Sequence, residues 1–176
     1  MEIQASCKFD YASAKALAHL SFYGKWNPKH RFIFWTVIYG IMLLVIGFEW
    51  LWIRKPLLIA AFGICIAFIL LQCYAYFLLP KIRYKAMGKT QGLENIYVFG
   101  EDGIKANARG AGIETGGEMA YTTFMRVIET SRYFFIFQSK NQAFLVDKST
   151  IEGGTAEQIR SRLSAVEGIK YTLCNY

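Results

Sequence analysis

The stretch GFEWLWIRKPLLIAA, Gly47 to Ala61, places two basic residues and a proline between two long apolar runs. The first run, Phe32 to Ile53, contains Glu49 as its one charged residue, and the second run, Leu57 to Leu79, contains none. At about 1.5 Å of rise per residue, each run is longer than the roughly 30 Å hydrocarbon core of a bilayer. Neither run has the polar face of a soluble amphipathic helix. The sequence therefore predicts two transmembrane helices, 32–53 and 57–79.

The segment Arg54-Lys55-Pro56 is the predicted hairpin loop between them. Charged side chains resist the hydrocarbon and stay at the interface, and proline suits the first turn of the second helix. Because three residues join only antiparallel neighbours, both chain ends lie on one side. Basic residues flank the hairpin on that side more densely than on the loop, and the positive-inside rule then predicts a two-helix cell-membrane protein with both termini cytoplasmic. The flanking basic residues are Lys25, Lys29, Arg31, Lys81, Arg83, Lys85 and Lys89.

The net charge of +7 is concentrated next to the predicted membrane. Residues 80–93 hold four basic and no acidic side chains, whereas residues 94–176 hold nine basic and ten acidic ones. Anionic lipid attracts such juxtamembrane charges, while a nucleic-acid-binding module would carry them on its soluble part. We expect anionic membrane lipids as partners, an unknown protein partner, and no nucleic acid. The possible lipid-headgroup contacts are Lys81, Arg83, Lys85 and Lys89, which fit a non-specific positive belt equally well.

The remaining segments predict a cytoplasmic α+β domain. Residues 1–31 contain a strand, Ile3 to Phe9, whose apolar residues alternate with polar ones, and a helix from Tyr11 to about Tyr23. After a basic connector at 80–92, residues 93–176 change to period-two patterning and end in a helix from Ala156. An unpaired strand edge is unfavourable, so we expect Ile3 to Phe9 to join the sheet of residues 94–150 across the hairpin.

Two stretches of the C-terminal part resemble the YcxB-like family of small bacterial membrane proteins. They are FGEDGI, from Phe99, and the segment YTTFMRVIETSRYFFIFQSKNQAFLVDKSTI, from Tyr121. The resemblance implies a two-helix hairpin followed by a pleckstrin-homology-like (PH-like) β-barrel, here about seven strands closed by a helix, and it implies no activity. The chain departs from the family pattern at Tyr121, usually tryptophan, and at 147–149, where Asp-Lys-Ser replaces a frequent Pro-Lys-Arg.

Several residues of the apolar runs are candidates for a role in the membrane. Glu49 fits an ion site or, near the loop, an interfacial carboxylate; Gln72 fits a solute ligand or a hydrogen bond to a neighbouring helix. Gly47 and Gly63 are each eight residues from Lys55, so they lie at one depth. The possible helix–helix contact residues are therefore Gly47, Gly63, Ala67 and Gln72.

No motif indicates catalysis, a cofactor or a metal site. The glycines at 110, 112, 116 and 117 lack the Gly-Lys-Ser/Thr sequence of a phosphate loop, and we expect a mobile connection between strands there. The four cysteines and two histidines form no cluster. Our hypothesis is a membrane-tethered binding module for a protein or a lipid headgroup. The alternatives are a small accessory subunit of a membrane complex that acts through its helices and, less favoured, an enzyme.

Overall fold

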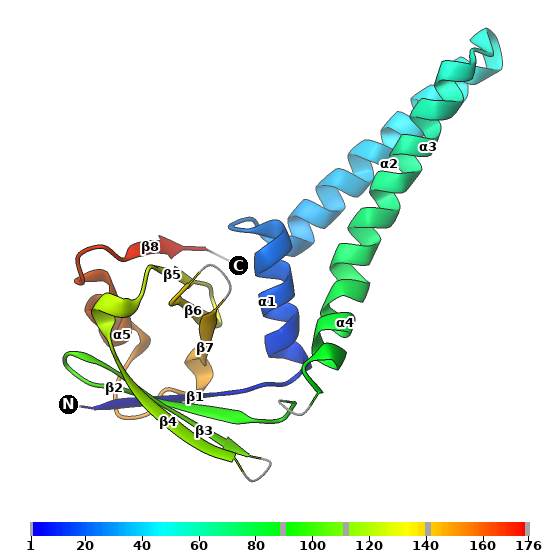
Figure 1. The fold of residues 1–176 in the computed structure, drawn as a ribbon. Coiled ribbons are helices and arrows are strands. Elements are labelled where there is room, and N and C mark those ends of the chain that lie inside the picture. The colour runs from blue at the N-terminus through cyan, green and yellow to red at the C-terminus, as the bar shows by residue number, and fades with distance from the viewer. Residues whose placement is uncertain (1, 89–90, 111–112, 140–141, 175–176) are drawn as a thin grey trace. The chain divides into compact units, whose positions relative to one another are not determined.

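The computed structural model describes residues 2–88, 91–110, 113–139 and 142–174, drawn as ribbons in Figure 1. The chain forms two compact units. The first unit combines residues 1–13 with residues 87–176, and the second consists of residues 14–86. The hairpin is thus an insertion within the chain of the first unit.

The first sheet of the first unit is antiparallel, with strand order β1-β2-β3-β4. Its strands are β1 (Ile3–Lys8), β2 (Glu94–Phe99), β3 (Gly103–Gly110) and β4 (Ile113–Ala120). The register pairs Ile3 with Phe99 and Lys8 with Glu94. The predicted pairing of the N-terminal strand with the later sheet is therefore present.

The second sheet has the order β7-β6-β5-β8 and faces the first (Figure 1). Its strands are β5 (Arg126–Glu129), β6 (Tyr133–Phe137), β7 (Ala143–Asp147) and β8 (Lys170–Leu173). Strand β8 runs parallel to β5, and helix α5 (Ala156–Ser164) precedes it in the chain. Thr155 begins α5 with a reciprocal capping box to Gln158.

The apolar core lies between the two sheets. Ala5 of β1, Phe99 of β2 and Phe134 of β6 are fully buried, and the rings of Tyr97 and Phe144 meet edge to face with centroids 6.2 Å apart. Helix α5 adds Ile159 and Leu163, both fully buried, at the four-residue spacing that places them on one face.

The structure departs from the sequence prediction at three points. The described strands form two separate four-stranded sheets, and neither closes into a barrel. The chain continues beyond the predicted closing helix into β8. Gly116 and Gly117 lie inside β4 rather than in a connection between strands, and Gly110 ends β3, while Gly112 lies outside the described residues. Glycine weakens a strand but does not exclude one, so the high glycine content led us to predict a connection where the structure has part of β4.

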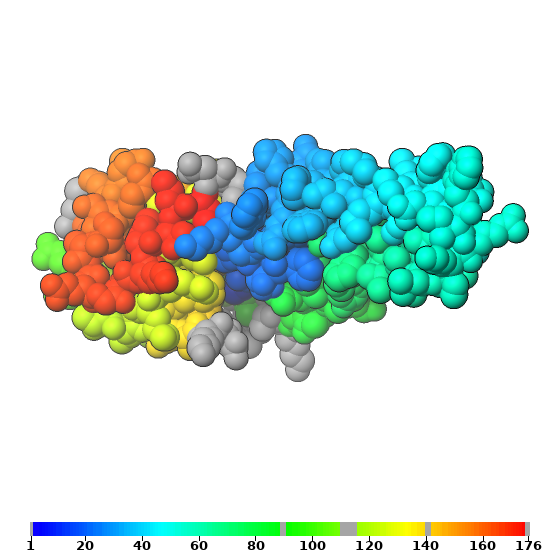
Figure 2. Space-filling model, turned by 90° about the horizontal axis from the view of Figure 1, so that it is seen from above, coloured from blue at the N-terminus to red at the C-terminus, as the bar shows by residue number. Residues whose placement is uncertain are grey.

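The second unit contains two helices long and apolar enough to cross a membrane, Pro28–Ile53 and Pro56–Ala86. Helix α2 (Pro28–Ile53) and helix α3 (Pro56–Cys73) lie side by side along the hairpin (Figures 1 and 2). A π-helical turn, Tyr74–Leu78, joins α3 to α4 (Leu79–Ala86). Helix α1 (Tyr11–Tyr23), which has its predicted bounds, precedes them.

Candidate functional site

A buried carboxylate, that of Glu129 at the end of β5, lies at the centre of a cluster of charged side chains in the first unit. Its side chain is fully buried. Arg160 of α5 donates from Nη2 to Oε1 at 2.6 Å and from Nε to Oε2 at 2.8 Å. Lys148 Nζ donates to Oε1 at 2.5 Å and to the carbonyl of Thr130 at 2.6 Å. The hydroxyl of Tyr171 in β8 donates to Oε2. One carboxylate thus ties together β5, β8, α5 and the turn after β7.

These donors keep Glu129 ionised. Burial by itself would raise the pKa of Glu129, but the hydrogen bonds from Arg160, Lys148 and Tyr171 outweigh burial and lower it to about 2. Burial and the neighbouring carboxylate raise the pKa of Tyr171 in turn. Each carboxylate oxygen of Glu129 accepts two hydrogen bonds from other side chains of the protein. The arrangement therefore fits a structural role better than that of an accessible acid or base.

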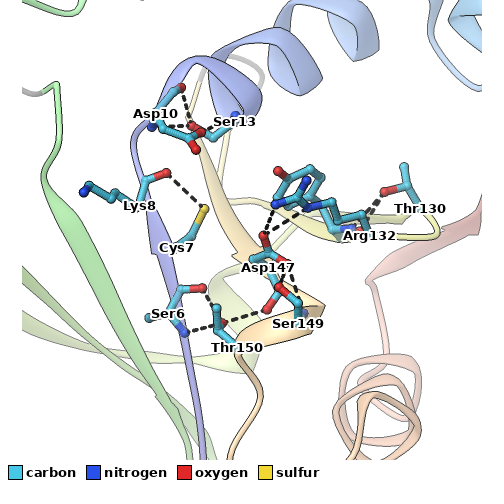
Figure 3. A network of polar contacts seen from close by, with 11 residues as sticks. Ser6, Cys7, Lys8, Asp10, Ser13, Thr130, Arg132, Asp147, Ser149 and Thr150 are labelled. Atoms are coloured by element: carbon cyan, nitrogen blue, oxygen red, sulfur yellow. Dashed lines mark hydrogen bonds and ion pairs between the residues drawn. The ribbon is translucent and has the colours of Figure 1, made fainter.

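A second polar network attaches β1 to the second sheet (Figure 3). Asp147, at the end of β7, accepts two bonds from Arg132 through Oδ2, at 3.0 and 3.2 Å, and two from Ser149 through Oδ1. The next residue, Thr150, donates from Oγ1 to the carbonyl of Ser6 at 2.7 Å and accepts from the Ser6 N–H at 2.9 Å. Backbone bonds between Gln4 and Glu152 continue this contact. The N-terminal strand is therefore held from both sides.

The loop between β2 and β3 borders a pocket of about 370 Å³. Arg162 of α5 donates to the carbonyls of Phe99 and Gly100, and the Tyr121 hydroxyl donates to Gly100 at 2.9 Å. These bonds fix the loop that forms the pocket's rim. The lining carries four acidic residues and one lysine: Glu2, Glu101, Asp102, Glu118 and Lys105. Acidic residues thus predominate among the charged groups of the pocket.

An aromatic cluster surrounds the π-helical turn of the second unit. The His19 ring stacks on Tyr76 with centroids 4.9 Å apart, and its Nε2 lies 3.2 Å from the Tyr76 carbonyl. Phe32 of α2 stacks on Tyr76 as well, at 4.6 Å. Burial lowers the pKa of His19, which favours the neutral ring. A π-turn interrupts the regular helical hydrogen bonding, and the histidine contacts the backbone there.

The predicted lipid-headgroup residues that the structure describes are all exposed. Lys81, Arg83 and Lys85 lie on α4, while Lys89 lies outside the described residues. Lys81 and Lys85 are four residues apart and share a helix face, whereas Arg83 projects from a different one. The structure thus brings two of the four predicted contacts onto a common surface.

The predicted helix–helix contact residues are only partly brought together. A Cβ built at Gly47 or at Gly63 would have no heavy atom within 4 Å, and Ala67 is exposed, so the expected close contact at these three positions is not found. Gln72 does meet another helix, since its Oε1 lies 3.5 Å from the hydroxyl of Tyr23 in α1. Equal distance from the hairpin loop did not bring these small residues into close contact with the neighbouring helix. Glu49 is exposed near the loop end.

Sequence reasoning missed Glu129 and its partners. A signal was available, because Glu129 ends the apolar stretch Val127-Ile128 and a charge in a buried strand needs a partner. No sequence signal identifies the partners of Glu129, which are Arg160, Lys148 and Tyr171, since 11 to 42 residues separate these four residues from one another. Two of the residues that depart from the family pattern also form hydrogen bonds. Tyr121 donates to the carbonyl of Gly100, and Asp147 accepts from Arg132.

These features define the class: an α+β unit of two sheets, interrupted in sequence by a hairpin of two helices apolar enough to span a membrane. Residues 99–161 match the family model described as YcxB-like protein, which confirms the predicted resemblance over this segment. The match runs from the end of β2 through the first two thirds of α5 and includes Glu129 and Arg160. No curated protein and no solved structure matches the chain.

Proposed function

We propose that this protein is a membrane-anchored binding module. The hairpin fixes it in the cell membrane, and the first unit recognises a protein partner at the cytoplasmic face without catalysing a reaction. The observation that carries the proposal is the pairing of β1 with β2 across the hairpin. Because strands before and after the hairpin share one sheet, both ends of the hairpin are connected to the same folded unit. Such an insertion holds that unit at the bilayer by two covalent connections.

The chemistry of the first unit supports recognition rather than catalysis. Its carboxylates with shifted pKa values, Glu129 and Asp147, are both neutralised by the protein's own donors. In the described part of the chain, every fully buried side-chain nitrogen and oxygen has a hydrogen-bond partner. Two facing sheets with a helix after β7 also support the PH-like arrangement that the family resemblance implies.

The charge of the first unit favours a protein partner over an anionic headgroup. Residues 94–176 carry a net charge of −1, from nine basic and ten acidic side chains. The acidic pocket beside Gly100 would repel a phosphate and complements a basic segment of a protein. The exposed lysines of α4 are the groups suited to anionic lipid. Lipid and protein contacts thus fall on different units of the chain.

The orientation can be tested with a reporter enzyme that is active only outside the cytoplasm. We expect a fusion after Tyr176 to be inactive and an insertion between Arg54 and Lys55 to be active, because the loop and the termini lie on opposite sides of the bilayer. Comparable protein levels of the two fusions serve as the control. Activity at the C-terminus would reverse the proposed orientation.

The binding role can be tested by site-specific photo-crosslinking in the full chain. A photoreactive residue at Lys105, which lines the acidic pocket, is expected to capture a defined protein in living cells. The same probe at Leu44, a highly exposed residue of α2, is expected to capture none. Reversing the pocket charges with Glu101→Lys and Glu118→Lys should reduce the adduct at least tenfold.

The matched control is Glu94→Lys, which reverses an exposed acidic residue at the opposite end of β2 and should leave the adduct unchanged. A protein adduct that forms at Leu44 and not at Lys105 would contradict the proposal. It would instead favour an accessory subunit that acts through its helices.

A further inference from the structure

A pocket of about 220 Å³ lies between α2 and α3 near the hairpin loop. All six residues that line it are apolar: Ile46, Gly47, Trp50, Leu58, Ile59 and Phe62. Gly47 contributes to the space, because a Cβ at this position would meet no heavy atom within 4 Å. An apolar groove of this kind offers no hydrogen-bond partner and therefore favours an apolar group as its occupant.

The hairpin loop places two positive charges within one helical turn of this pocket. Arg54 caps α2 in the left-handed region (φ 48°), and its N–H donates to the carbonyl of Trp50, a lining residue. The carbonyl of Lys55 accepts from the N–H of Leu58, another lining residue. Both basic side chains are exposed, and neither forms an ion pair within the described residues.

We propose that the pocket and the loop together bind one anionic phospholipid. An acyl chain occupies the apolar pocket, and the phosphate lies against Arg54 and Lys55. This inference rests on the membrane anchoring proposed above. Apolar space and unpaired cations one turn apart match the two ends of a lipid, and two positive charges attract an anionic headgroup more strongly than a zwitterionic one. Glu49, the one acidic residue of this helix, is not among the residues that line the pocket.

A second copy of the chain is the competing occupant, because a bulky side chain could also fill the pocket. In a parallel pair, however, the two basic loops would lie at the same depth and close together. Four positive charges would then repel one another at the membrane surface. An anionic lipid neutralises the loop instead of adding to its charge.

The test uses the full-length protein in mild detergent, with lipid binding followed by native mass spectrometry. We expect the wild type to retain one phosphatidylglycerol in preference to phosphatidylethanolamine. Gly47→Leu fills the pocket and should reduce phosphatidylglycerol binding at least tenfold. The double variant Arg54→Gln, Lys55→Gln should lose the preference between the two lipids. Leucine favours a helix over glycine, so the Gly47 variant keeps α2 intact.

Gly40→Leu is the matched control, since Gly40 also has open space at its Cβ, lies on the same helix and does not line the pocket. It should bind phosphatidylglycerol as the wild type does. Equal binding of the two lipids by the wild type, or unchanged binding by Gly47→Leu, would overturn the inference. A wild-type dimer that Gly47→Leu converts to a monomer would overturn it in favour of a second copy.

Membrane fractionation separates this outcome from a failure of the proposed function. A chain that alkaline carbonate releases from membranes contradicts the anchoring itself. A chain that stays in the membrane and shows no lipid preference contradicts only the lipid site.

Discussion

Replacing Glu129 with glutamine is expected to lower the stability of the first unit by about 3 kcal/mol. The substitution keeps the shape of the side chain but removes the charge that Arg160 and Lys148 share. Removing one partner of a buried ion pair leaves the other charge uncompensated, which is costly, although the partial exposure of Arg160 lets water recover part of the loss. Thermal unfolding of the full chain in detergent, followed by far-ultraviolet circular dichroism, measures the effect.

The exposed ion pair between Glu118 and Lys105 provides the control. Its charged atoms are 3.8 Å apart and both side chains are more than half exposed, so Glu118→Gln should cost less than about 1 kcal/mol. Equal melting of the wild type and Glu129→Gln would show that the buried cluster contributes nothing to stability.

The same cluster predicts a defined acid sensitivity. The pKa of Glu129 is lowered from 4.5 to about 2 in the folded chain, so its contribution is fully present above about pH 4.5. It declines as the pH falls from 4.5 towards 2, because the unfolded chain binds the proton first. The difference in melting temperature between wild type and Glu129→Gln should therefore shrink over this interval. A difference that stays constant from pH 6 to pH 2.5 would contradict the assigned ionisation.

Replacing Ala5 with aspartate is expected to detach β1, at a cost of about 3 kcal/mol or more. Ala5 is fully buried opposite Tyr97, and an ionised carboxylate there would lie in the apolar core between the sheets. Cys7, two residues along the same face of β1, reports the change. Burial, with smaller effects from Asp147 and Asp10, raises the pKa of Cys7 to about 12, so its thiol is protected in the folded chain.

Maleimide labelling of Cys7, located by peptide mass spectrometry, should be about 100-fold faster in Ala5→Asp than in the wild type, since each 1.4 kcal/mol corresponds to a factor of ten. Gln4→Asp introduces the same group one residue away on the exposed face and should change labelling by less than tenfold. Wild-type protection of Cys7 in Ala5→Asp would mean that β1 does not depend on its buried face.

The N-terminal strand was predictable because two independent physical constraints agree on it. Its buried residues Ile3, Ala5 and Cys7 alternate with more exposed ones, as the sequence indicates. An apolar strand face also requires a partner sheet, and the short loop at Pro56 predicts that this sheet follows an antiparallel pair of helices and so returns to the same end of the hairpin. The helices were predictable for a similar reason, since length and apolarity are properties of a single segment.

Features that depend on tertiary context were not predictable. Strand β8 consists of four residues with mixed polarity, and it is defined by parallel pairing with β5 rather than by its own pattern. The π-helical turn at Tyr74–Leu78 lies in an apolar run that reads as regular helix. The partners of Glu129 come from three distant elements. For β8 and for Glu129, the determining contact is made with a residue far away in the sequence.

The β1–β2 pairing also has a consequence for biosynthesis. Ile3 pairs with Phe99, so roughly 90 residues, including the whole hairpin, must be synthesised between the two strands. At about 5–20 residues per second, β1 waits roughly 5 to 20 s for its partner to leave the ribosome. During this interval its apolar face and its unpaired edge are open to other chains. The hairpin is therefore synthesised before the sheet can be completed, and a delay in synthesis across the hairpin would prolong the aggregation-prone state.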